Sequence, residues 1–199
     1  MSRNTRLEGG KNYSLSTLFS GDNDKVVIPD LQRDYCWGNE DVNLVGPFID
    51  SLMELDKSQN LTMGLIYGYY DELCPNHLQL CDGQQRLTTL FLTLGVLNRL
   101  TQGRYKTLLM SQYELLEDDY EPYLLYSIRE SSLYFISDLV SHYFLQIDEK
   151  DKELKSINDV ISCPWYLNSY RTDPTVASIV SAIMTIEEKF RGTSLEILL

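Results

Sequence analysis

The chain has 199 residues, of which 43% are hydrophobic and 23% charged, a composition typical of globular rather than disordered or fibrous proteins. Its formal net charge of −12 argues against a general nucleic-acid coat protein, because such proteins bind phosphates through clustered lysine and arginine, but it leaves room for a small basic pocket. The N-terminal residues lack the pattern of a secretory signal, and the mostly apolar stretch 87–100 is too short and polar to span a bilayer, so we expect a cytoplasmic protein. Four cysteines without metal-ligand spacing predict reduced thiols and no structural zinc site: Cys36, Cys74, Cys81 and Cys163.

Strand and helix signals alternate over the first part of the chain. The stretch 25–29 has the β-branched content of a short strand that a proline ends. Apolar residues recur at helical spacing over 42–55, and Pro47 inside this pattern predicts a kink or a restart of the helix. Two more strands are expected at 62–70 and 78–81, joined by a hairpin connection.

A helix expected over 83–100 is apolar on most of its sides, so it should be largely buried. The formal charge is −3 up to Lys106 and −9 beyond it. This change of composition beside the turn at Gly103 predicts two domains, 1–106 and 107–199.

The second part is expected to be entirely helical. Ser131 or Ser132 can cap one helix, and Asp173-Pro174 is a typical helix start. The acidic run 114–121 is expected to be a solvated helix end or loop rather than a cation site. The apolar residues 195–199 either dock on a surface or continue into a longer chain, and we favour the longer chain.

The most informative stretch is Asp-Gly-Gln-Gln-Arg, where a strand passes through a short turn into the buried helix. Such a junction directs free backbone N–H groups and the positive end of the helix dipole to one place, which attracts phosphate. Gly83 lets a ligand approach the backbone, and Arg86 offers bidentate donors to phosphate oxygens. Gln84 and Gln85 can orient a water molecule or hold a ribose or base edge. Asp82 can carry a metal or accept a proton.

A structural interpretation of the same stretch stays open. Asp82 as N-cap with Gln85 three residues later would form a capping box, worth about 1 kcal/mol of helix stability. A capping box leaves Gly83 unexplained, because glycine in a helix costs about 0.5–1 kcal/mol relative to alanine.

A second polar and aromatic cluster follows the first strand, in which Gln32 and Arg33 precede Tyr35 and Trp37. As a binding site, Arg33 would face phosphate while one of the two rings stacks on a base. As structure, Arg33 would pair with a neighbouring aspartate and the rings would fill the core, and the cluster alone favours this interpretation. Neither of the common glycine-rich nucleotide-binding motifs, the P-loop or G-x-G-x-x-G, is present.

Together, the two motifs resemble the N-terminal domain of the GmrSD-type restriction endonucleases, in the same order and roughly fifty residues apart. Weaker likeness continues through 126–132 and 165–176, so the resemblance covers most of the chain. It implies an α+β fold with a ParB/sulfiredoxin-like core, that is, a small mixed sheet with helices, followed by an all-helical C-terminal part.

The resemblance also implies that this chain binds and hydrolyses a nucleoside triphosphate through the motif Asp82, Gly83, Gln84, Gln85 and Arg86, and our own hypothesis adds Mg²⁺. Among these residues we expect Asp82, Gln84, Gln85 and Arg86 to act in catalysis, and the carboxylate chemistry of Asp82 makes it the expected metal ligand. The resemblance gives Gln32 and Arg33 the second wall of the nucleotide site. Together with Gly83, Arg86 and Tyr35, whose ring could stack on a base, they are the expected nucleotide-binding residues.

Members of this family act in bacterial defence against modified phage DNA, which a separate C-terminal His-Asn-His nuclease domain cleaves. The only histidines, His77 and His142, lack suitable neighbours for such a motif. We therefore expect that these 199 residues do not cleave DNA by themselves. Either the nuclease lies on a further portion of the chain or on a partner subunit, with DNA reached through the whole assembly, or this protein never cuts DNA. A homo-oligomer is compatible with this scheme.

Two hypotheses follow for the site. In the first, the domain is an enzyme that hydrolyses a nucleoside triphosphate and thereby regulates a nuclease. In the second, the same pocket binds a nucleotide or a modified base without turnover and acts as a sensor. We favour the first.

Overall fold

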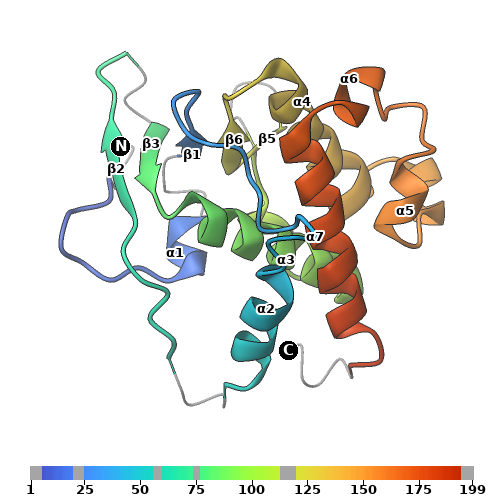
Figure 1. Ribbon diagram of the computed structural model, residues 1–199, viewed down its shortest axis with the longest axis horizontal. Helices are drawn as coiled ribbons and strands as arrows, with labels where there is room; N and C mark the ends of the chain where they lie inside the picture. The colour runs from blue at the N-terminus through green and yellow to red at the C-terminus, as the bar shows by residue number, and fades with distance from the viewer. Residues whose placement is uncertain (1–5, 20–24, 56–59, 74–76, 113–119, 194–199) are drawn as a thin grey trace.

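The computed structural model describes residues 6–19, 25–55, 60–73, 77–112 and 120–193. A four-stranded mixed sheet has the order β2-β3-β1-β6 (Figure 1). Its central strand β1 (Lys25–Ile28) runs parallel to both β3 (His77–Asp82) and β6 (Leu124–Tyr126). The edge strand β2 (Tyr67–Tyr70) pairs antiparallel with β3. The expected strands and hairpin of the first part are therefore confirmed, although β2 is shorter than predicted.

Most helices lie to one side of this sheet, to its right in Figure 1, while the edge strand β2 stands at the opposite border of the view. In chain order the helices are α1 (Leu15–Leu18), α2 (Val45–Met53), α3 (Gln84–Leu100), η1 (Lys106–Leu108), α4 (Glu130–Asp138), the π-helix η2 (Leu139–Phe144), η3 (Glu149–Glu153), α5 (Ile157–Val160), α6 (Asn168–Arg171) and α7 (Pro174–Phe190). The α+β class is confirmed, and most helices lie toward the C-terminus.

The second part of the chain is not helical throughout, which corrects one detail of the prediction. Strands β4 (Met110–Gln112) and β5 (Tyr120–Pro122) form a separate antiparallel pair, and β6 completes the main sheet beside β1. Each of these strands has three residues, too few to show the alternation from which strands are predicted. The division into 1–106 and 107–199 and the likeness to the ParB/sulfiredoxin core stay predictions. The acidic run 114–121 lies mostly outside the described residues.

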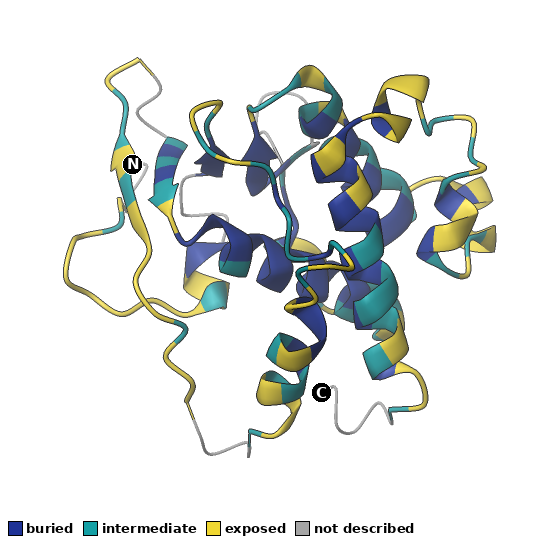
Figure 2. Cartoon of the chain, viewed as in Figure 1, coloured by how far each residue is buried: buried dark blue, intermediate teal, exposed yellow. Residues whose placement is uncertain are grey.

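The core lies between the sheet and two long helices, α3 and α7, which pack against each other. Helix α3 is buried along most of its length, as predicted (Figure 2). Gly95 of α3 lies against the ring of Phe144, where an added Cβ would come within 2.3 Å of the ring. The hydrophobic core is shared by both parts of the chain.

Three helix starts differ in how well the sequence predicted them. Asp173 caps α7, since its carboxylate accepts hydrogen bonds from the backbone of Thr175 and the following residue, and the prediction is confirmed. Helix α4 begins earlier than expected, with Arg129 at the N-cap instead of a serine. Helix α2 begins at Val45, so Pro47 lies in its first turn and not in its interior. Because the backbone N–H groups of the first turn have no partner within the helix, a proline there removes no hydrogen bond and α2 continues through it.

Candidate functional site

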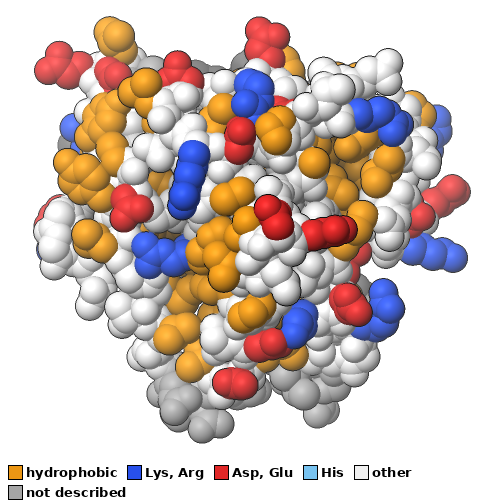
Figure 3. Space-filling view, in the orientation of Figure 1, with side chains coloured by type: hydrophobic (Ala, Val, Ile, Leu, Met, Phe, Trp, Pro, Cys, Tyr) orange, Lys and Arg blue, Asp and Glu red, His pale blue; other side chains and the backbone are white. Residues whose placement is uncertain are grey.

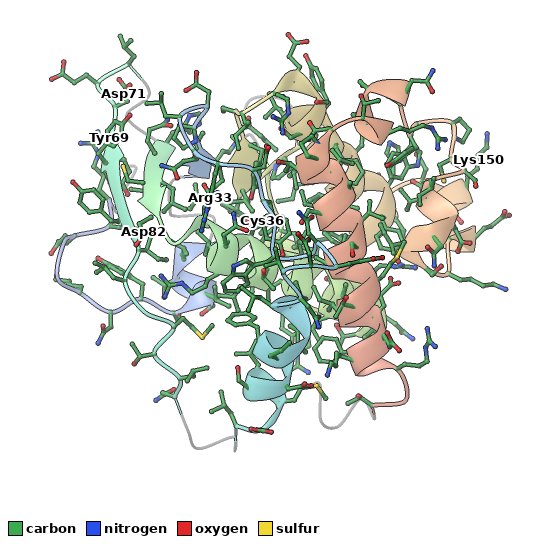
Figure 4. All side chains as sticks on the ribbon, viewed as in Figure 1. Arg33, Cys36, Tyr69, Asp71, Asp82 and Lys150 are labelled. Atoms are coloured by element: carbon green, nitrogen blue, oxygen red, sulfur yellow. The ribbon has the colours of Figure 1, made fainter. Side chains whose placement is uncertain are left out.

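The two predicted motifs meet at the junction of β3 and α3 and enclose a pocket of about 250 Å³. Its lining residues are Gln32, Arg33, Trp37, Asp82, Gly83, Gln84, Gln85 and Arg86. The segment after β1 passes over the start of α3, so that Arg33 lies near the end of β3, where Asp82 projects, and Cys36 lies farther along over α3 (Figure 4). Only the fold brings these segments together, because about fifty residues separate them in the chain.

Gly83 opens the helix in a conformation that favours glycine. It is the N-cap of α3 with φ +93°, and no side chain caps the helix. An added Cβ would also lie 3.4 Å from the carbonyl oxygen of Leu65. Asp82 is the last residue of β3 and its side chain is exposed, so the capping-box interpretation was wrong. The first N–H groups of α3 are therefore not satisfied by a capping side chain.

Gln85 uses its whole amide to hold the segment after β1. Its Nε2 donates to the carbonyl of Asp34 at 2.8 Å. Its Oε1 accepts from the backbone N–H groups of Cys36 at 2.9 Å and Trp37 at 3.3 Å. Because the side chain is only 5% exposed and fully engaged, its evident role is to position this wall of the pocket.

Only the nitrogen of the Gln84 side-chain amide forms a hydrogen bond with a described residue. Its Nε2 donates to the carbonyl of Arg33 at 2.6 Å. Its Oε1 is buried and accepts no hydrogen bond from any described residue, although the side chain lines the pocket. A buried acceptor without a donor costs about 1–3 kcal/mol, so this oxygen is suited to a donor supplied by a ligand or by water.

Arg33 supplies a positive charge that the fold does not use. Its side chain is exposed at the pocket, and its guanidinium has no hydrogen bond or ion pair with a described residue. Gln32 beside it donates from Nε2 to the carbonyl of Cys81 at 3.1 Å, which ties the segment to β3. The arrangement leaves Arg33 available to an anion.

Arg86 is engaged with a neighbouring segment of backbone. Its guanidinium donates to the carbonyl of Met63 and, at 3.1 Å, to the carbonyl of Leu65. Gly64 between them has φ +94°, and a Cβ there would come within 2.0 Å of the guanidinium. Arg86 thus fastens the segment that precedes β2 while it lines the pocket.

Tyr35 does not reach the pocket, contrary to the predicted contact with nucleotide. Its side chain is 0% exposed, and its hydroxyl lies 2.8 Å from the hydroxyl of Thr89 on α3. Burial raises the pKa of this phenol, despite the hydrogen bond with Thr89. Of the two aromatic residues in the motif, Trp37 is the one that lines the pocket.

A charged network that was not predicted from the sequence lies behind the pocket wall. Arg129 donates bidentately to Asp173, with both N–O distances 3.1 Å, and its guanidinium also pairs with Asp34. Thr175 donates from its hydroxyl to the same carboxylate of Asp34 at 2.9 Å. No local pattern indicates this network, because Asp34 lies 95 residues from Arg129. It joins the pocket wall to the start of α7.

The network predicts a pH dependence of stability through Asp173. Burial alone would raise its pKa, but hydrogen bonds from Arg129 and Ser131 outweigh burial and hold the pKa below its ordinary value. A carboxyl group whose pKa is lower in the folded than in the unfolded protein stabilises the fold at pH values above its unfolded-state pKa. This stabilisation is lost as the pH falls through the folded-state pKa. Asp173→Asn is therefore expected to lower the free energy of unfolding by about 1–3 kcal/mol at pH 7 and by less below about pH 4.

Urea unfolding at pH 7 and pH 3 measures this difference. Asp41→Asn is the matched control, because Asp41 is exposed and has no ion pair with a described residue. A deficit for Asp173→Asn that is the same at both pH values would contradict the assignment.

The pocket offers a ligand that fits Mg²⁺. Among the lining residues, Asp82 supplies the single carboxylate. Mg²⁺ in phosphate sites is held by one or two carboxylates together with substrate oxygens and water. Among the described residues, the one group of three close metal-ligating side chains lies elsewhere, at His142, Asp148 and Asp151.

Fold and site together define an α+β domain built around a polar strand–helix junction, with an arginine and an aspartate exposed at its mouth. A family model for the N-terminal domain of the GmrSD restriction endonucleases matches residues 15–196, and the chain belongs to this family. The membership confirms the resemblance and implies a part in a restriction system that acts on modified DNA. No curated protein and no solved structure matches the chain. Over the described residues, no helix is both long and apolar enough to cross a membrane.

Proposed function

We propose that this domain binds a nucleoside triphosphate with Mg²⁺ in the pocket between Arg33 and the start of α3, and hydrolyses it to regulate DNA restriction. The observation that carries the proposal is the uncapped N-terminus of a 17-residue buried helix, which meets an arginine that has no partner among the described residues. Free N–H groups, the helix dipole and a guanidinium all favour phosphate at this place.

Each remaining polar group has a place in this scheme. Arg33 would neutralise phosphate oxygens, and Asp82 would hold Mg²⁺, which balances the charge of the phosphates when it is bound. The free Oε1 of Gln84 would accept a hydrogen bond from the attacking water. Attack of that water on the terminal phosphorus breaks the bond to the bridging oxygen and releases a nucleoside diphosphate and inorganic phosphate.

DNA cleavage is assigned to another part of the system. The net charge of −12 does not suit tight non-specific DNA binding by this chain, since such binding depends on lysine and arginine contacts to phosphates. We place the His-Asn-His nuclease on a further domain or a partner subunit, in the cytoplasm, and a homo-oligomer is compatible with this arrangement.

A non-hydrolysing sensor is the second candidate, and the use of Gln85 and Arg86 favours it. Both side chains were predicted to act in catalysis, but they hold neighbouring backbone segments instead. Gln85 and Arg86 are then not available to position or activate a water molecule for hydrolysis. In this case calorimetry would detect nucleotide binding while no phosphate is released.

The test compares the unaltered protein with Arg33→Ala. Arg33 has no structural partner among the described residues, so its replacement should leave stability unchanged while it weakens binding of a non-hydrolysable triphosphate by about 10–100-fold. Phosphate release should fall with it. Arg104→Ala is the control, because Arg104 is exposed and lies outside the pocket.

The four common nucleoside triphosphates are tested with Mg²⁺, by calorimetry and by release of inorganic phosphate. Binding without release would select the sensor. If none of the four binds, or if Arg33→Ala binds like the unaltered protein, the pocket is not a phosphate site.

A further inference from the structure

A second cavity, of about 490 Å³, lies in the helical part of the molecule, and none of its lining residues lines the first pocket. It is formed by the C-terminal ends of α3 and α7 together with the segment 152–156. A volume of this size is within the usual range for pockets that hold small molecules.

The cavity is lined by an unusual concentration of positive charge. Four cationic side chains face it, Arg99, Lys152, Lys155 and Arg191, against the single carboxylate of Glu187. Beyond residue 106 the chain has a net charge of −9, yet three of the seven lysines and arginines of that part line this cavity. Basic side chains stand beside acidic ones around the lower end of α7 (Figure 3). Positive charge focused in a hollow of an acidic protein attracts small anions.

One of the four cations, Arg99, already forms an ion pair with the carboxylate of Glu187. Arg99 lies 3.4 Å from Glu187, donates to the carbonyl of Leu154 at 2.6 Å, and stands 3.8 Å over the ring of Tyr143. Its side chain is 13% exposed and that of Glu187 is 19% exposed. This pair therefore forms a fixed wall of the cavity with little net charge.

The remaining cations are available to a ligand. Lys155 and Arg191 are exposed, and neither side chain has an ion pair with a described residue. Lys152 pairs with Glu149 at 2.6 Å, but both side chains are more than half exposed, and such surface pairs contribute only about 0–1 kcal/mol. The side chains of Lys155 and Arg191, and also that of Lys152, can therefore bind the same anion.

Part of the remaining wall is apolar and suits the body of an organic ligand. Val96, Leu100, Leu154 and Phe190 line the cavity beside the cations. We propose that this cavity binds a small organic phosphate with at least two negative charges, whose apolar body lies on these side chains. Lys155 and Arg191 are its principal charged contacts. The site is independent of the proposed nucleotide pocket.

Calorimetric titration of the full chain with ADP and with inorganic pyrophosphate tests the proposal. The Arg33→Ala variant is the background, so that phosphate binding at the first pocket is weakened. We expect ADP to bind several-fold more tightly than pyrophosphate, because only ADP has a body that covers the apolar wall. The double substitution Lys155→Ala and Arg191→Ala should weaken binding of both probes by at least tenfold.

Lys150→Ala with Arg104→Ala is the matched control, since it removes the same charge from exposed positions outside the cavity. Binding in this control should change less than twofold, and neither pair should alter the midpoint of thermal unfolding. The proposal is overturned if neither probe binds at millimolar concentration, or if both pairs weaken binding equally. A short DNA duplex is a third probe. Binding of the duplex alone, dependent on Lys155 and Arg191, would also overturn the proposal and assign the surface to DNA.

Discussion

Replacement of Arg129 by methionine is expected to lower the free energy of unfolding by about 2–3 kcal/mol at pH 7. The substitution leaves Asp173 charged while its side chain is only 1% exposed, and it also removes the ion pair to Asp34. Truncating one partner of a buried pair costs about 3–5 kcal/mol, and the 38% exposure of Arg129 reduces that figure through solvent screening. Urea unfolding measures the loss.

Two further variants make this result specific. Arg129→Lys should recover only part of the stability, because an ammonium group cannot donate bidentately to Asp173 and also reach Asp34. Arg104→Met removes an exposed arginine with the same change of side chain and should change stability by less than about 0.5 kcal/mol. If Arg129→Met costs no more than Arg104→Met, the network does not hold the pocket wall to α7.

The second large effect is expected from Gly38→Ala. Gly38 packs against the backbone of α7, where an added Cβ would lie 1.9 Å from the carbonyl oxygen of Ser178 and 2.8 Å from the nitrogen of Ala182. Backbone on both sides cannot give way as a flexible side chain can. The segment must therefore leave α7, and it would lose the hydrogen bond from its N–H to the Ser178 hydroxyl. We expect a cost of about 3 kcal/mol or more, together with weaker nucleotide binding.

Gly46→Ala is the matched control for this substitution. Gly46 is also buried, but the nearest atom to an added Cβ is the flexible end of Lys189, at 3.5 Å. Because Gly46 lies in the first turn of α2, alanine should be neutral or stabilise the protein by up to about 1 kcal/mol. Thermal unfolding compares the stability of the two variants, and nucleotide titration compares their affinities. Equal stability of Gly38→Ala and Gly46→Ala would show that the pocket wall adapts freely.

Most of the first part of the chain could be predicted because its signals are local. The strand at 25–28, the hairpin and the buried helix after Gly83 each depend on patterns within a few residues. The start of α7 was predicted for the same reason, since Asp173 caps it within three residues. The short strands beyond residue 106 were missed, because three residues of β6 are stabilised by pairing with β1 and not by their own pattern.

The candidate site was predicted only in part. The sequence placed Arg33 and the residues from Asp82 to Arg86 in one site, and the structure lines one pocket with them. It assigned roles to Gln85 and Tyr35 that their surroundings do not favour, because an amide or a ring in a sequence does not show what lies opposite it. Burial and hydrogen-bond partners decide that question.

The class of the domain, its family and the segments that carry the site could therefore be predicted without a structure. These depend on residue types and spacings along the chain. The folded arrangement was needed to see that Arg33 and Asp82 remain exposed at the pocket and that the buried Oε1 of Gln84 lacks a donor among the described residues. It was likewise needed to see that Arg129 braces the pocket wall from 95 residues away. The physical reason is that hydrogen bonds and ion pairs form between groups that folding brings together, at separations that no local pattern records.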